Sequence, residues 1–108
     1  MLPKKNRLSR KDIGLLFKKG ASLSSPNLSL RFIKNTSLTS SGISFIVPKN
    51  VVKLATRRNS LRRLAYNIVE KQKRTPPAYF MGAFIFRKYP DNSHVLENEI
   101  KSLLDKIN

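Results

Sequence analysis

An uninterrupted apolar run in the last third of the chain limits the folds that it can adopt. Residues 79–86 read Tyr-Phe-Met-Gly-Ala-Phe-Ile-Phe, without a charged side chain. A strand with one face in water alternates apolar and polar residues, whereas this run is apolar at odd and even positions alike. It therefore predicts a central strand that is covered on both faces. Its Phe and Met residues are most simply core residues.

The other patterns predict three helices and three further strands. In chain order these elements cover residues 10–19, 21–25, 28–34, 42–47, 53–73 and 93–107. The strands over 28–34 and 42–47 flank a polar segment, so we expect a hairpin in which they are antiparallel neighbours. The long helix should begin near Lys53, and Ser93 is the expected cap of the last helix.

The charge of the chain is concentrated toward its N-terminus. Residues 1–69 hold 15 Lys and Arg against one acid, Asp12, and the whole chain has a net charge of +16. A chain with this much self-repulsion normally has a polyanionic partner. A hydrophobic content of 40% over 108 residues supports one folded domain over residues 1–108 and not a disordered basic tail. Nucleic acid is the best match for the partner.

The composition also limits compartment and chemistry. No apolar run approaches the ~20 residues that span a bilayer, and the N-terminal segment lacks an apolar signal region, so we expect a cytoplasmic protein. The absence of cysteine excludes disulfides and thiolate zinc sites. Six carboxylates and one histidine, His94, form no recognisable catalytic or metal-binding pattern. We therefore expect no catalytic residue, metal or cofactor in the protein alone.

The densest cationic segment opens the long predicted helix. Residues 49–63 hold six cations and no acid. Apolar positions recur there at the spacing of one buried face, with polar positions opposite. The predicted buried set is Leu61, Leu64, Ala65 and Ile68, and the predicted exposed set is Asn59, Arg62, Arg63 and Tyr66. Guanidinium forks match phosphate oxygens. The alternative is a merely solvated helix face, although such faces usually mix charge signs.

Exposed aromatic rings would add base stacking to these phosphate contacts. Phe17 and Tyr66 are the candidates, and Phe17 fits the core at least as well. A second basic cluster, Lys4 to Arg7, precedes the first helix. The strand-rich centre favours recognition of RNA over a helix placed in a DNA groove.

Several of these blocks resemble the protein component of bacterial ribonuclease P. Its members open with a Lys-Lys-Asn-Arg-Leu-like segment, here residues 4–8, and a helix with a Phe and a basic-Gly ending, here residues 17–20. An Ala-Val-x-Arg-Asn-Arg-x-Lys-Arg-like helix follows a strand end in that family, here residues 55–63 after 47–50. Ser60 replaces the second Arg of the Arg-Asn-Arg motif. The chain resembles a divergent member.

The resemblance implies an α+β fold, a two-layer α/β sandwich in αβββαβα order. Its βαβ crossover would be left-handed, against the usual preference. The resemblance also implies an accessory subunit of an endoribonuclease, in which a large RNA with bound Mg²⁺ removes the 5′ leader of precursor tRNA. The expected partners are that RNA and precursor tRNA, with no membrane and no obligate protein partner.

The cationic clusters and the resemblance together assign residues to two surfaces. The RNA-binding set is Lys4, Lys5, Asn6, Arg7, Lys49, Arg57, Arg58, Asn59, Arg62 and Arg63. A cleft between the first helix and the sheet would receive the single-stranded leader, and its set is Ile13, Phe17, Leu28 and Leu30. A small ribosomal-type structural protein is the alternative from another class. A membrane-surface protein is a weaker match, because the core needs the apolar stripes.

Overall fold

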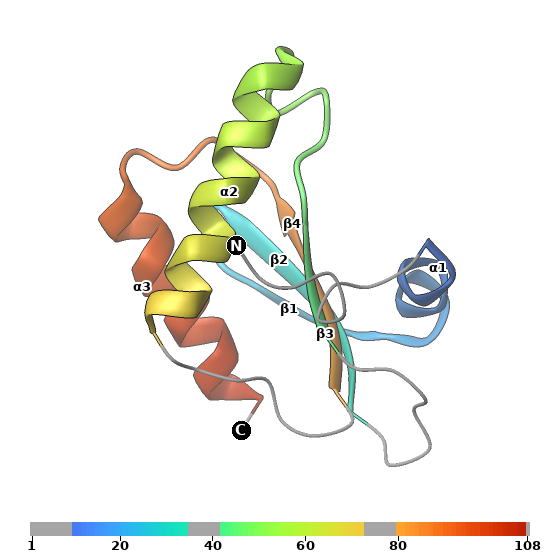
Figure 1. The fold of residues 1–108 in the computed structure, drawn as a ribbon. Helices are drawn as coiled ribbons and strands as arrows, with labels where there is room; N and C mark the ends of the chain where they lie inside the picture. The colour runs from blue at the N-terminus through green and yellow to red at the C-terminus, as the bar shows by residue number, and fades with distance from the viewer. Residues whose placement is uncertain (1–9, 35–41, 73–79, 108) are drawn as a thin grey trace.

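Three helices and one four-stranded sheet make up the described part of the computed structural model, residues 10–34, 42–72 and 80–107. In chain order they are α1 (Arg10–Lys19), β1 (Ala21–Ser24), β2 (Leu28–Lys34), β3 (Gly42–Ile46), α2 (Ala55–Lys71), β4 (Phe80–Phe86) and α3 (Ser93–Lys106). Helices α2 and α3 cover one face of the sheet, and α1 lies on the opposite face (Figure 1). The α+β class and the αβββαβα order are confirmed.

Strand β4 takes an inner position in the sheet, whose strand order is β1-β2-β4-β3. It pairs antiparallel with β2 and parallel with β3. Six of its seven residues are buried, as the apolar run predicts. The prediction that β2 and β3 form a hairpin of neighbours is wrong, because β4 lies between them. With β4 inserted, Phe84 pairs with Leu30 on one side and stacks on Phe45 on the other at 5.0 Å between ring centroids.

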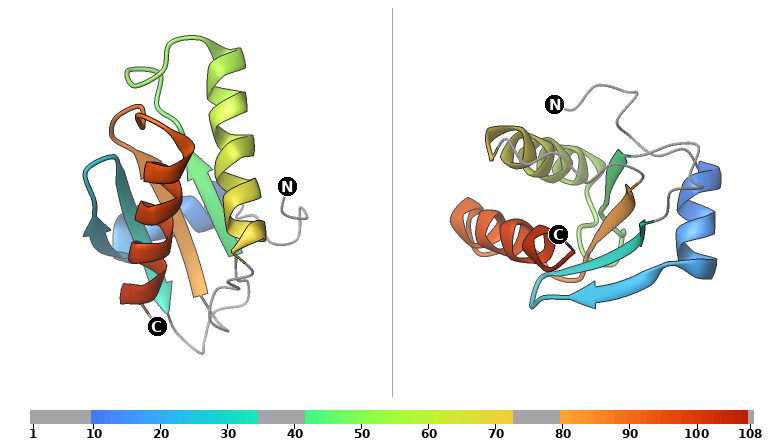
Figure 2. Two further views of the ribbon diagram at one scale, coloured as in Figure 1. Left: turned by 90° about the vertical axis from the view of Figure 1, so that its left-hand side faces the viewer. Right: turned by 90° about the horizontal axis from the view of Figure 1, so that it is seen from below.

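The crossover from β3 through α2 to β4 is left-handed. In the left-hand view of Figure 2, α2 lies in front of the sheet, both strands run upward, and β4 lies to the left of β3. A right-handed unit seen from this side would place β4 on the right. The handedness that the family resemblance implies is therefore present.

Side chains of β4 point alternately into two cores. Its three Phe residues face α2 and α3 in the main core, whereas Met81 and Ala83 pack with Leu16 of α1. A Cβ atom on Gly82 would lie 2.6 Å from the fully buried Phe80 ring. A glycine is therefore needed at this point of an otherwise apolar run.

One helix start and one helix cap differ from the predictions. Helix α2 begins at Ala55, and its N-cap residue is Leu54. Helix α3 begins at Ser93, and the residue that caps it is Asn92, whose Oδ1 accepts a hydrogen bond from the backbone N of Val95 at 2.9 Å. Asn and Ser are comparable capping residues, so the sequence alone does not separate these two positions.

A buried carboxylate joins α3 to the turn between β1 and β2. Oε1 of Glu99 accepts hydrogen bonds from the backbone N of Asn27 at 2.8 Å and from Oγ of Ser25, and Oε2 accepts one from Nδ2 of Asn27 at 2.6 Å. Burial raises the pKa of Glu99, but the hydrogen bonds from Ser25, Asn27 and Leu28 outweigh it and hold the pKa below its ordinary value. The ionised carboxylate therefore stabilises the packing of α3 on the hairpin.

We predict that this carboxylate makes stability depend on acid pH. Because its pKa is lower in the folded chain, its contribution is complete above the ordinary value of about 4.5 and is lost as pH falls through the folded-state pKa. Glu99→Gln should lower the free energy of unfolding at pH 7 by about 1–3 kcal/mol. Urea unfolding from pH 7 to pH 3 would show the gap between wild type and variant closing. Glu97→Gln, on the exposed side of α3, is the control and should change little.

Candidate nucleic-acid interface

Helix α2 presents cations on the side that faces away from the core. Its buried residues are Leu61, Ala65, Tyr66, Ile68 and Val69. Arg57, Asn59, Arg62 and Arg63 are exposed, as are Lys49 and Lys53 in the segment before the helix. We call Asn59, Arg62 and Arg63 the α2 face. The other predicted RNA contacts, Lys4, Lys5, Asn6 and Arg7, lie outside the described residues.

Hydrogen bonds orient two of the α2 guanidinium groups differently. Nη2 of Arg62 donates to Oδ1 of Asn59 one helical turn earlier, which holds the Arg62 group on the exposed face. Nη1 of Arg58 instead donates to the backbone oxygens of Val52 at 3.0 Å and Lys53 at 2.7 Å. Arg58, predicted as an RNA contact, therefore uses donors to fix the segment that leads into α2.

The start of α2 has no negative charge of its own. Its first turn contains no acidic residue, and the N-cap Leu54 has no side-chain acceptor. The backbone N–H groups and the positive end of the helix dipole therefore remain uncompensated by side chains there. Together with Lys53 and Arg57, this end of the helix adds to the attraction for anions.

Two sequence assignments on α2 are corrected. Tyr66, predicted as an exposed stacking ring, is 6% exposed, and its Oη accepts a hydrogen bond from the backbone N of Phe45 at 3.3 Å. Its ring meets Phe45 edge-on, with 5.0 Å between centroids. Leu64, predicted as buried, is 36% exposed. The long side chain of Tyr66 lies at the edge of the apolar stripe of α2 and reaches the sheet. The buried face of the helix therefore includes Tyr66 and not Leu64.

A second candidate surface lies on the side of the sheet that α1 covers. Phe17 is 48% exposed, and the guanidinium carbon of Arg31 lies 5.6 Å from the centroid of its ring. Nη1 of Arg31 also donates to the backbone oxygen of Phe17 at 3.3 Å. Ile13, one turn before Phe17, is half-buried. We call Ile13, Phe17 and Arg31 the α1 face.

Leu28 and Leu30 do not belong to this surface. Both are fully buried in the main core, on the side of β2 that faces α2 and α3. Their predicted place in a cleft beside α1 is therefore wrong. Strand alternation puts Arg31 on the opposite side from Leu30, and Arg31 was not among the residues predicted from the sequence. The alternation along this strand would have predicted Arg31 on the α1 side if Leu30 had been assigned to the main core.

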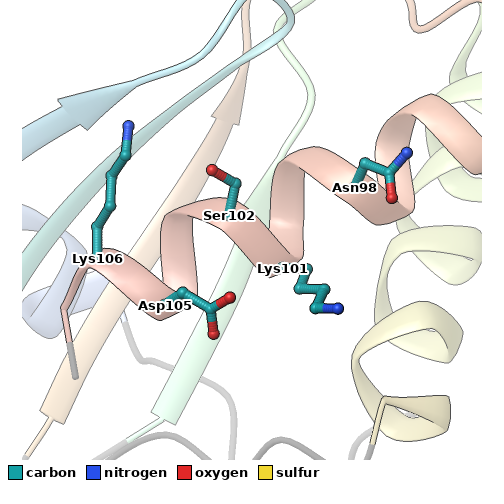
Figure 3. Close-up of a pocket in the computed structure, with 5 residues that line it drawn as sticks. All are labelled: Asn98, Lys101, Ser102, Asp105 and Lys106. Carbon is teal, nitrogen blue, oxygen red and sulfur yellow. The ribbon is translucent and has the colours of Figure 1, made fainter.

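Other hollows and clusters in the described residues are less suited to a site. Figure 3 shows a shallow depression along α3, lined by Asn98, Lys101, Ser102, Asp105 and Lys106, whose side chains spread along one helix and do not converge. Within residues 10–34, 42–72 and 80–107, no group of three or more His, Cys, Asp or Glu is placed to hold a metal ion. None of the helices there is long and apolar enough to cross a membrane.

The fold and the α2 face together define a basic α+β protein with an exposed array of donors for phosphate oxygens. A model of the ribonuclease P family matches residues 2–108. The chain is 30% identical to the ribonuclease P protein of Thermotoga maritima in complex with 1-(4-fluorophenyl)-2-thiourea, with a TM-score of 0.79 over 94% of this chain and 100% of that one. The chain therefore belongs to the family of bacterial ribonuclease P protein components.

A more distant structure shows the same fold. The ribonuclease P protein of Staphylococcus aureus is 16% identical, with a TM-score of 0.79 over 98% of this chain and 97% of that one. Comparison with curated protein sequences gives no match. The fold is thus kept while most side chains differ, so the role of each residue must be argued from this chain.

Proposed function

We propose that this chain binds the RNA subunit of ribonuclease P and the 5′ leader of precursor tRNA, and so assists 5′ maturation of tRNA. The observation that supports the proposal most is the exposed α2 face, which carries guanidinium groups within a stretch, residues 49–69, that contains no acidic residue. Its opposite side is buried in the core, so these groups are held on a rigid element. The α2 face would bind phosphates of the RNA subunit.

The RNA subunit would carry out the cleavage. In this proposal Mg²⁺ is bound by the RNA, as the family resemblance implies, and the protein supplies cations and positioning. The six carboxylates in the whole sequence are few, and Glu99 already accepts hydrogen bonds from Ser25 and Asn27. The protein alone should therefore be inactive.

The α1 face would receive the leader. An exposed aromatic ring offers an unpaired base a stacking surface, and a guanidinium beside it offers a phosphate contact. Phe17 and Arg31 supply this pair, and their mutual contacts preorganise both side chains. Helices α1 and α2 lie on opposite sides of the sheet (Figure 2, right), so the two surfaces would contact different RNA segments.

Reconstitution tests the proposal. Purified protein should not cleave precursor tRNA, and adding the cognate RNA subunit with Mg²⁺ should give cleavage at the 5′ leader. Sequencing of the RNA that co-purifies from cells is the matched measurement. Recovery of ribosomal RNA in place of the ribonuclease P RNA, with no stimulation of cleavage, would favour a structural ribosomal-type protein.

We predict that the arginines of α2 divide into two groups. Arg62→Ala and Arg63→Ala should each flatten the slope of log affinity for the RNA subunit against log salt by about 0.7–0.9, one phosphate contact. Their melting temperatures should stay close to wild type, because both side chains are exposed. Arg58→Ala should instead lower the melting temperature, since it leaves two backbone oxygens without a donor. Unchanged salt slopes in both exposed variants would mean that these side chains are only solvated.

A further prediction concerns the leader. Phe17→Leu keeps an apolar side chain on α1 but removes the ring, so affinity for precursor tRNA should fall by about 1–3 kcal/mol while the fold is retained. Affinity for mature tRNA, which has no leader, should not change. Both are measured with the reconstituted complex, and Leu15→Ala on the same helix serves as a packing control. Equal losses for the two ligands would remove Phe17 from leader recognition.

A further inference from the structure

A hollow of about 400 Å³ lies beside the start of α2. It is lined by Val51, Val52, Lys53, Leu54, Arg57 and Tyr89. The first five residues come from the β3–α2 connection and the first turn of α2, and Tyr89 comes from the β4–α3 connection. Its volume lies within the range of small-ligand pockets, roughly 300–1,000 Å³.

Two apolar side chains in this hollow remain accessible to solvent. Tyr89 is 53% exposed and Leu54 is 61% exposed, although both are large enough to contribute to a core. They are unusual in this respect, because most large apolar residues in the described part of the chain are buried. An exposed aromatic ring beside an aliphatic side chain can cover both the face and the edge of a flat ligand.

Backbone contacts fix the walls of the hollow. The oxygen of Pro48 accepts hydrogen bonds from the backbone N atoms of Val51 at 3.0 Å and Val52 at 3.1 Å. Arg58 then holds the oxygens of Val52 and Lys53 from the side of α2. On the opposite wall, Tyr89 precedes the buried Pro90. The proline restricts the backbone of Tyr89 to extended conformations, and so fixes the point from which its side chain leaves the chain.

The charge of the hollow selects its ligand. Lys53 and Arg57 are both exposed cations, and none of the six lining residues is acidic. A purely apolar peptide would gain nothing from these cations, and a bare phosphate would gain nothing from the Tyr89 ring. A ligand that carries a flat apolar group and a negative charge within one unit uses both parts. An unpaired nucleotide has this composition.

We propose that this hollow is a binding subsite for one unpaired nucleotide of an RNA strand. The base stacks on Tyr89 beside Leu54, and the adjoining phosphate contacts Arg57 and Lys53. The inference rests on the proposed RNA-binding function but uses different residues from the α2 and α1 faces. It gives the protein a separate contact to a single-stranded segment, read through stacking and charge and not through base sequence.

The test uses full-length protein and two labelled strands, penta-adenylate and an abasic pentamer with the same phosphates. Fluorescence anisotropy at fixed salt gives their affinities. Tyr89→Ala should weaken binding of penta-adenylate about 5- to 100-fold and leave the abasic strand unchanged. Tyr89→Phe keeps the ring and should stay within about twofold of wild type. Lys101→Ala, an exposed cation on α3, is the control for general charge.

A second variant guards against a folding defect in Tyr89→Ala. The chain has no tryptophan, so Tyr89→Trp introduces a single indole at the site. Penta-adenylate should quench its fluorescence and the abasic strand should not. The inference is overturned if neither strand quenches the indole, if Tyr89→Ala binds penta-adenylate like wild type, or if a poly-glutamate peptide displaces penta-adenylate with equal affinity.

The same set of variants separates this inference from the proposed function. If Arg62→Ala weakens binding to the ribonuclease P RNA while Tyr89→Ala leaves penta-adenylate binding intact, the nucleotide subsite is wrong and the function stands. If wild type shows no measurable affinity for either the ribonuclease P RNA or penta-adenylate, the proposed function itself fails.

Discussion

Strand β4 must be covered on both faces, and the positions of the other elements follow from this requirement. Its Phe side chains need α2 and α3 on one side, and Met81 and Ala83 need α1 on the other. Its two edges are paired with β2 and β3. Burial of each large side chain contributes roughly 1.5–3 kcal/mol, so the apolar residues of this strand outweigh any single surface contact. The basic helix is carried on this framework.

The placement of α2 turns that framework into a surface for anions. One side of the helix is committed to the core, so every cation near its start is directed to solvent or to the segment before it. Arg62 and Arg63 remain free of the core, whereas Arg58 braces the backbone at Val52 and Lys53. Neighbouring arginines of one basic motif thus have two roles: Arg58 stabilises the segment before the helix, and Arg62 and Arg63 belong to the exposed surface itself. A count of positive charges does not show this division.

Periodicity predicted the elements well but did not determine which element each face meets. Alternation placed Leu28 and Leu30 on one side of β2 correctly, yet helices cover both sides of this sheet, and the assumed partner α1 was the wrong one. The β2–β3 hairpin was wrong because the strand that separates them follows much later in the chain. Tyr66 was misplaced because a spacing of 100° per residue ignores side-chain length. Alternation could have placed Arg31 once Leu30 was assigned to the main core, whereas Tyr89 was recognised only when distant segments were brought together.

The carboxylate of Glu99 bonds to residues 72 and 74 positions earlier in the chain, which has a consequence for protein synthesis. Neither β4 nor α3 exists when β1, β2 and β3 emerge from the ribosome, so the early strands lack their central neighbour and their tether. Contacts this distant in sequence form late and slow the folding of small domains. During that interval the nascent chain already displays most of its cations. The basic segments of the chain are therefore synthesised before the fold can be completed, and the last helix determines when that stage ends.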